Sequence, residues 1–80
     1  MNEHQKKIRE LTSYIEKNGY SSVKFDMDLA ELGSDNRHYY FYANPHHDEN
    51  FKWYIEVVDT NKGEEGYKII PKTREPDRYN

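Results

Sequence analysis

Residues 22–29 read SVKFDMDL and alternate between apolar and polar side chains without a break. One side of this stretch carries Val23, Phe25, Met27 and Leu29, and the other carries Ser22, Lys24, Asp26 and Asp28. A strict period of two is typical of a strand that buries one side and leaves the other in water. The stretch therefore predicts a half-buried strand, and with it a sheet that has one covered face and one open face.

The segment before this strand predicts one amphipathic helix. Ile8, Leu11 and Ile15 follow the spacing i, i+3, i+7, which places them on one narrow stripe of a helix. Asn18-Gly19 supplies the stop, because glycine accepts the left-handed conformation that ends many helices. We expect a helix from about Glu3 to Lys17, whose narrow apolar stripe can cover one face of a sheet and little else.

Three more strands follow, each separated from the next by turn residues. Residues 37–43 are dense in β-forming aromatics, residues 51–59 alternate again, and residues 66–70 form a short run before Pro71. Strands joined in chain order by short turns pair as an antiparallel meander. The predicted fold class is α+β, with one N-terminal helix packed on one face of a four-stranded antiparallel meander sheet (αββββ). We expect a single domain over residues 1–71 and a disordered tail over residues 72–80.

The alternation also predicts which side chains share a face of the sheet. A slip of one residue would set apolar side chains against charged ones, whereas a slip of two keeps every side chain on its face. The pattern therefore specifies the faces but leaves a two-residue shift of the pairing open. The pairs we expect are Phe41 with Trp53, Tyr40 with Tyr54, His38 with Glu56, Ile55 with Ile69, and Glu56 with Lys68.

The composition fits one small folded domain. The chain has 80 residues and no cysteine, so neither a second core nor a disulfide framework is expected. Aromatic residues make up 15 % of it, which argues against disorder although 34 % of the residues are charged. No apolar run is long enough for a membrane span and no signal peptide is evident, so we expect a cytoplasmic protein. The net charge is −3, and residues 18–70 hold ten acidic side chains against five basic ones.

The face of the sheet that the helix leaves open is the candidate binding surface. It should present Asp26, Asp28, His38, Tyr40, Tyr42, Lys52, Tyr54, Glu56 and Lys68. Tyrosine offers a large, rigid contact area with a polar tip, and protein interfaces are enriched in it. Tyrosine is also simply a good strand former on a half-wet sheet. We predict a protein-binding site made of Asp26, Asp28, Tyr40, Tyr42, Tyr54 and Glu56.

No residue pattern predicts catalysis or a cofactor. The chain lacks a cysteine nucleophile, a Gly-x-Ser-x-Gly elbow, a glycine-rich phosphate loop and a His-Glu-x-x-His motif. His46-His47-Asp48-Glu49 contains metal-binding residue types, but neighbouring side chains diverge, and structural metal sites draw spaced ligands from a rigid frame. A polar hairpin tip is the simpler interpretation. We predict no catalytic residue, no metal site and no cofactor.

These features favour a small, non-catalytic protein-binding module. The carboxylates expected on the open face would repel phosphate and attract a basic partner, such as a nucleic-acid-handling enzyme whose surface the module would occupy. In size and composition the chain resembles the small inhibitor and immunity proteins of phages and mobile elements, which implies an inhibitor of the anti-defence type. Two alternatives stay open: a homodimer that buries the tyrosines, and a binder of single-stranded nucleic acid that uses the same face.

Overall fold

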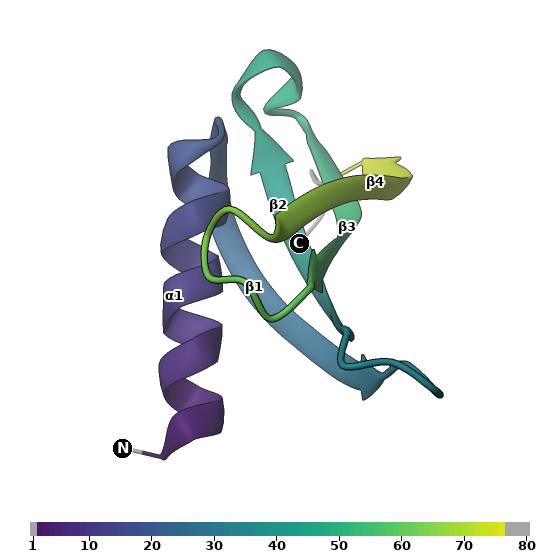
Figure 1. Cartoon of the computed structure of the whole chain (residues 1–80). Coiled ribbons are helices and arrows are strands. Elements are labelled where there is room, and N and C mark those ends of the chain that lie inside the picture. Colours follow the sequence, from purple (N-terminus) through teal and green to yellow (C-terminus); the bar gives the residue numbers. More distant parts are fainter. Residues whose placement is uncertain (1, 77–80) are drawn as a thin grey trace.

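One helix and four strands follow one another along the chain in the computed structural model, which describes residues 2–76 (Figure 1). The elements are α1 (Glu3–Lys17), β1 (Tyr20–Ala30), β2 (Arg37–Pro45), β3 (Phe51–Asp59) and β4 (Tyr67–Pro76), with a 3-10 turn at His46–Asp48. Each strand pairs antiparallel with the next, so the sheet order is β1-β2-β3-β4. The predicted αββββ fold is confirmed: one helix precedes an open four-stranded antiparallel meander.

The helix α1 begins and ends where its capping residues place it. The side chain of Asn2 accepts a hydrogen bond from the Gln5 backbone N–H at 2.8 Å, which satisfies one of the donors that a helix start leaves unpaired. At the other end the chain turns through Gly19 at φ +93°, a conformation that glycine adopts without a steric clash. Leu11 and Ile15 of the apolar stripe are fully buried. The predicted helix is confirmed.

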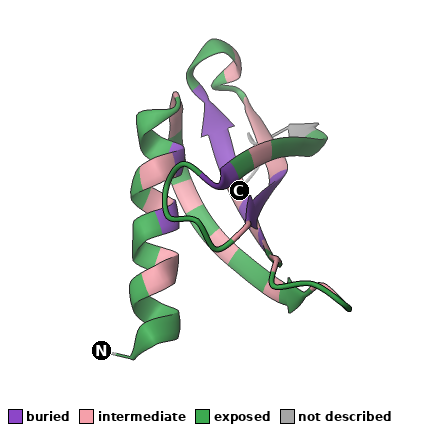
Figure 2. Cartoon of the chain, in the orientation of Figure 1, coloured by how far each residue is buried: buried purple, intermediate pink, exposed green. Residues whose placement is uncertain are grey.

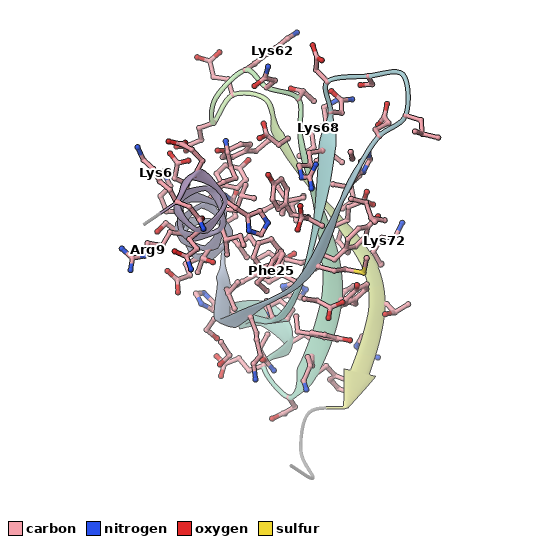
Figure 3. All side chains as sticks on the ribbon, turned by 90° about the horizontal axis from the view of Figure 1, so that it is seen from below. Lys6, Arg9, Phe25, Lys62, Lys68 and Lys72 are labelled. Carbon is pink, nitrogen blue, oxygen red and sulfur yellow. The ribbon has the colours of Figure 1, made fainter. Side chains whose placement is uncertain are left out.

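The core lies in a single layer between α1 and the sheet (Figure 2). It is filled by Leu11, Ile15, Tyr39, Phe41, Ala43, Ile55, Val57 and Tyr67. The Phe25 ring of β1 meets the Phe41 ring edge to face, with the two centroids 5.5 Å apart. Figure 3 shows Phe25 between the helix and the sheet. None of the elements that the structure describes covers the opposite face of the sheet.

The strands pair two residues away from the predicted register. Phe41 lies opposite Ile55 instead of Trp53, and in the last hairpin Val57 lies opposite Ile69. Every side chain of β2 and β3 nevertheless keeps its predicted face, because a shift of two residues preserves the alternation. The predicted pairs were therefore wrong, since the hydrophobic pattern is the same in both registers. The predicted faces of β2 and β3 are confirmed.

A β-bulge in β1 overturns the unbroken alternation predicted for residues 22–29. Between Phe25 and Met27 the pairing with β2 skips one residue, so Asp26 is inserted between two paired positions. A bulge sets two residues of one strand against one of its neighbour, which reverses the faces of the residues beyond it. Met27 and Leu29, predicted in the core, consequently point to the open face, where they are 41 % and 51 % exposed.

The same bulge moves Asp28, predicted on the open face, to the helix side of the sheet. Its side chain is 11 % exposed; the carboxylate hydrogen-bonds with His4 Nε2 at 3.0 Å and accepts from Arg37 Nε at 2.6 Å. Burial by itself would raise the pKa of Asp28, but these hydrogen bonds hold that pKa below its ordinary value. The prediction was wrong because a period-two pattern contains no sign of an inserted residue.

The last strand is longer than the sequence pattern indicates. β4 continues past Pro71 to Pro76, so residues 72–76, which the pattern assigned to the tail, belong to the sheet. The rest of the predicted tail, residues 77–80, lies outside the described residues. The strand also crosses the domain limit that was expected at residue 71.

The chain remains in the sheet beyond Pro71 because an edge strand tolerates a proline and because Arg74 makes contacts that hold the end of the strand. Proline has no backbone N–H to donate, which an edge strand next to a bulge tolerates. β4 is such an edge strand, and Lys72 is inserted there between two paired positions. The Arg74 guanidinium lies 3.5 Å from the centroid of the Phe51 ring, and Arg74 Nε donates a hydrogen bond to Asp48 at 2.7 Å. These contacts hold the end of β4 against β3 and the preceding turn.

Candidate functional site

The face of the sheet that points away from α1, here called the open face, is built of three cross-strand rows. Each row takes one residue from every strand, in the order β1 to β4. The rows are Leu29–His38–Val58–Lys68, Met27–Tyr40–Glu56–Ile70 and Lys24–Tyr42–Tyr54–Thr73. Lys52 and the inserted residues Asp26 and Lys72 complete the face. Figure 3 shows Lys72 on the side of the sheet away from the helix.

Five of the six predicted binding residues lie on the open face, and Asp28 does not. Five further residues of the face were not expected there: Met27, Leu29, Ile70, Lys72 and Thr73. No local pattern marks the first two, because their position depends on the bulge. Ile70 had a usable signal, since the alternation of the last strand places Ile69 inside and its neighbour outside. Lys72 and Thr73 follow from the unexpected length of β4.

Three tyrosines form one ring cluster at the centre of the open face. The rings of Tyr40 and Tyr54 are stacked, with centroids 5.7 Å apart and an interplanar angle of 13°. The Tyr42 ring contacts Tyr54 as well, at 4.9 Å and 50°. The Lys52 ammonium lies 5.6 Å from the Tyr42 centroid. The stacking of Tyr40 on Tyr54 and the position of Lys52 over Tyr42 each cover part of the ring faces, and all three tyrosines remain partly exposed.

The bulge residue Asp26 is tied to this cluster. The Tyr54 hydroxyl donates a hydrogen bond to the Asp26 carboxylate at 2.7 Å. Burial raises the pKa of the Tyr54 hydroxyl, and the hydrogen bond to Asp26 raises it further. The carboxylate thus positions a phenol, and part of its hydrogen-bonding capacity is used within the protein.

Glu56 occupies the middle of the open face and is only 6 % exposed. Its Oε2 contacts His38 Nδ1 and accepts a hydrogen bond from the Tyr40 hydroxyl at 3.4 Å, and its Oε1 lies 3.4 Å from Lys72 Nζ. Burial would raise the pKa of Glu56, but the hydrogen bonds from His38 and Lys72 hold that pKa below its ordinary value. A carboxylate at this depth is stable only with such partners, and they shield it from a binding protein.

His38 bridges two carboxylates. Its Nδ1 faces Glu56, and its Nε2 contacts Glu31 Oε1 at 2.7 Å. Ionised carboxylates only accept hydrogen bonds, so both ring nitrogens must donate, which requires the imidazolium form. The hydrogen bonds to Glu31 and Glu56 accordingly raise the pKa of His38 above its ordinary value. The chain of side chains Glu31–His38–Glu56–Lys72 therefore balances its own charges.

Aliphatic side chains and lysines surround this polar centre. Met27 and Leu29 in β1 and Ile70 in β4 are between 40 % and 51 % exposed. Lys24 and Lys68 end two of the rows at opposite edges of the sheet. Within residues 2–76 neither lysine side chain takes part in an ion pair or a hydrogen bond. Each edge of the open face thus combines exposed apolar side chains with one of these lysines, and the β1 edge also carries the exposed carboxylate of Asp26.

The turn at His46–Asp48, which holds three of the four candidate metal-binding residues, makes structural contacts. Asp48 accepts hydrogen bonds from Arg74 at 2.7 Å and from the Trp53 indole at 3.2 Å. The bond from Arg74 keeps the pKa of Asp48 below its ordinary value. In the described part of the chain, no three His, Cys, Asp or Glu side chains lie close enough together to hold a metal ion.

A cleft of about 350 Å³ lies on the helix side of the molecule, between α1 and the connection from β3 to β4. Its lysines are paired within the protein, Lys7 with Asp59 at 3.1 Å and Lys17 with Glu64 at 2.9 Å. Lys7 also donates a hydrogen bond to the Tyr67 hydroxyl at 3.1 Å. These contacts hold β3, β4 and their connection against the helix, so the residues that line the cleft have a structural role.

Comparison of the chain with protein-family models, with characterised proteins and with solved structures gives no match. Over residues 2–76, no helix combines the length and the apolar character needed to cross a membrane.

Proposed function

We propose that the chain is a small, non-catalytic protein-binding module of the cytoplasm whose open face occupies a surface of a larger protein. The observation that carries the proposal is the exposure of Met27, Leu29 and Ile70 on either side of the tyrosine cluster. Tyrosine and methionine are enriched at protein interfaces, and apolar groups that flank such a cluster gain free energy when a partner covers them. An inhibitor that blocks its target by covering it is the concrete form of this proposal.

The tyrosine cluster supports a protein partner because it is ordered before binding. Tyr54 contacts Tyr40 and Tyr42, and its hydroxyl is held by Asp26. Side chains that are already fixed lose little conformational entropy when a complex forms. The same rings can then offer contact area and hydroxyl hydrogen bonds at low cost.

The ring geometry disfavours single-stranded nucleic acid as the ligand. Bases stack on exposed aromatic faces, whereas here Tyr40 and Tyr54 already stack on each other and Lys52 lies over the ring of Tyr42. The net charge of −3 also opposes binding of a polyanion. Ring edges and hydroxyl groups are better suited to the mixed polar and apolar surface of a protein.

Affinity capture from a lysate of the source organism tests the proposal with three versions of the protein. The first is the native chain. The second is Met27→Ser with Leu29→Ser, which removes aliphatic groups from the open face at two half-exposed positions. The control, Lys6→Ser with Arg9→Ser, changes two exposed residues on the outer side of α1 (Figure 3). We expect one protein to be retained by the native chain and the control and lost by the open-face variant.

Folding and self-association are measured on the same samples. Circular dichroism and urea denaturation verify that the variants are folded. Retention of the same proteins by all three versions would contradict the proposal. Sedimentation analysis separates the homodimer, because a native dimer that Met27→Ser with Leu29→Ser dissociates would assign the face to a second copy of this chain.

A further inference from the structure

The accessible charges of the open face differ from those expected from the sequence. Asp28 lies on the other side of the sheet, and Asp26 accepts a hydrogen bond from Tyr54. The carboxylate of Glu56 is buried and bound by its neighbours on the face. Lys24 at the β1 edge and Lys68 at the β4 edge remain exposed with no ion-pair partner within residues 2–76, although residues 18–70 hold twice as many acidic as basic residues, and Asp26 keeps one exposed negative charge beside Tyr54.

We infer that the partner contacts the open face with an acidic segment whose carboxylates pair with Lys24 and Lys68 and whose apolar side chains cover Met27 and Leu29. This inference rests on the proposed function and reverses the charge that the sequence led us to expect for the partner. Neither lysine has an ion-pair partner within residues 2–76, so pairing with the segment breaks no contact there. Complementary charges of this kind steer association and set the orientation of the complex.

The positions of the two lysines define the reach that the segment needs. Lys24 begins the third row on β1 and Lys68 ends the first row on β4, so the tyrosine cluster lies between them. The two edge strands are three strand spacings apart, about 14 Å, and the two rows lie four residues apart along β2, about 13 Å, so the two lysine positions are about 19 Å apart. An extended segment of about six residues or a helix of about thirteen residues covers this distance. A short linear segment is therefore long enough to engage both edges.

Selection from a random displayed peptide library tests this chemistry without knowledge of the partner. The native chain is compared with Lys24→Glu, Lys68→Glu and with a control, Lys6→Glu, Arg9→Glu, which makes the same change in charge on the outer side of α1 (Figure 3). We expect the native chain and the control to enrich peptides that combine Asp or Glu with apolar residues. Affinity of such a peptide should fall about tenfold in the open-face variant and less than about twofold in the control.

The other possible outcomes contradict either the acidic partner alone or the proposed function as well. Enrichment of Lys- and Arg-rich peptides by the native chain would refute the acidic partner. If the Met27→Ser, Leu29→Ser variant then no longer enriched these basic peptides, the proposed function would still hold. Enrichment that none of the open-face substitutions changes would refute both. Binding of oligo(dT) that Lys24→Glu, Lys68→Glu abolishes would also refute both, because it would identify nucleic acid as the ligand of the face. Circular dichroism confirms that each variant is folded.

Discussion

Two neighbouring substitutions in β1, Met27→Ala and Asp28→Asn, distinguish a bulged strand from a regular one. In the bulged strand the Met27 residue is 41 % exposed, and the Asp28 side chain is 11 % exposed and bound by His4 and Arg37. In a regular strand that kept the alternation of residues 22–29, the methionine would be buried and the aspartate would lie in water. The two arrangements therefore predict opposite orders of cost.

The structure sets the size of each effect. Full burial of a methionine side chain contributes about 1.5–3 kcal/mol, and Met27 is only about three-fifths buried, so truncation to alanine should cost about 1 kcal/mol. Hydrogen bonds to a charged group contribute about 1.5–3 kcal/mol each when they are shielded. Both partners of Asp28 are about half exposed, which screens the interaction, so Asp28→Asn should cost roughly 1–2 kcal/mol in total.

Urea denaturation at neutral pH measures both costs through the fluorescence of Trp53, the single tryptophan, which packs against the core. Leu11→Ala, at a fully buried position, provides the reference for a core truncation at about 2–5 kcal/mol. A regular strand would give a similar cost for Met27→Ala and less than about 0.5 kcal/mol for Asp28→Asn. Those two values together would refute the bulge and the open face built on it.

Three further predictions concern single groups. Phe41 is fully buried in β2, so Phe41→Ala should cost about 3–5 kcal/mol in urea denaturation, and a cost below about 1 kcal/mol would place the ring outside the core. His38 should titrate above its ordinary pKa of 6.5 in NMR spectra, because Glu31 and Glu56 hold its imidazolium form. The stability it contributes is complete below pH 6.5 and is lost as the pH rises through the folded-state pKa; His38→Gln should abolish this dependence, and a pKa below 6.5 would contradict the bridge. Tyr54 should ionise at a higher pH than an ordinary tyrosine, and Asp26→Asn should lower its pKa in ultraviolet titration; an unchanged titration would mean that the two groups do not interact.

Local patterns were enough to predict the elements and most of their faces. The stripe of Ile8, Leu11 and Ile15 and the stop at Asn18-Gly19 depend on residues a few positions apart, so the helix could be predicted from them. The alternation of β2 and β3 placed the three tyrosines on the open face for the same reason. A two-residue error in register left these placements intact, because it moves no side chain to the other face.

Contacts between distant residues decided the register, the bulges and the charge of the candidate site. Asp28 lies on the helix side together with His4 and Arg37, and neither partner can be identified from the pattern of residues 22–29. Whether a carboxylate such as Glu56 can reach a partner depends on the neighbours that surround it in space. The open face therefore exposes a lysine without an ion-pair partner within residues 2–76 at each edge, although its strands lie in the acidic part of the chain. Ion pairing and burial follow from the folded arrangement and not from composition.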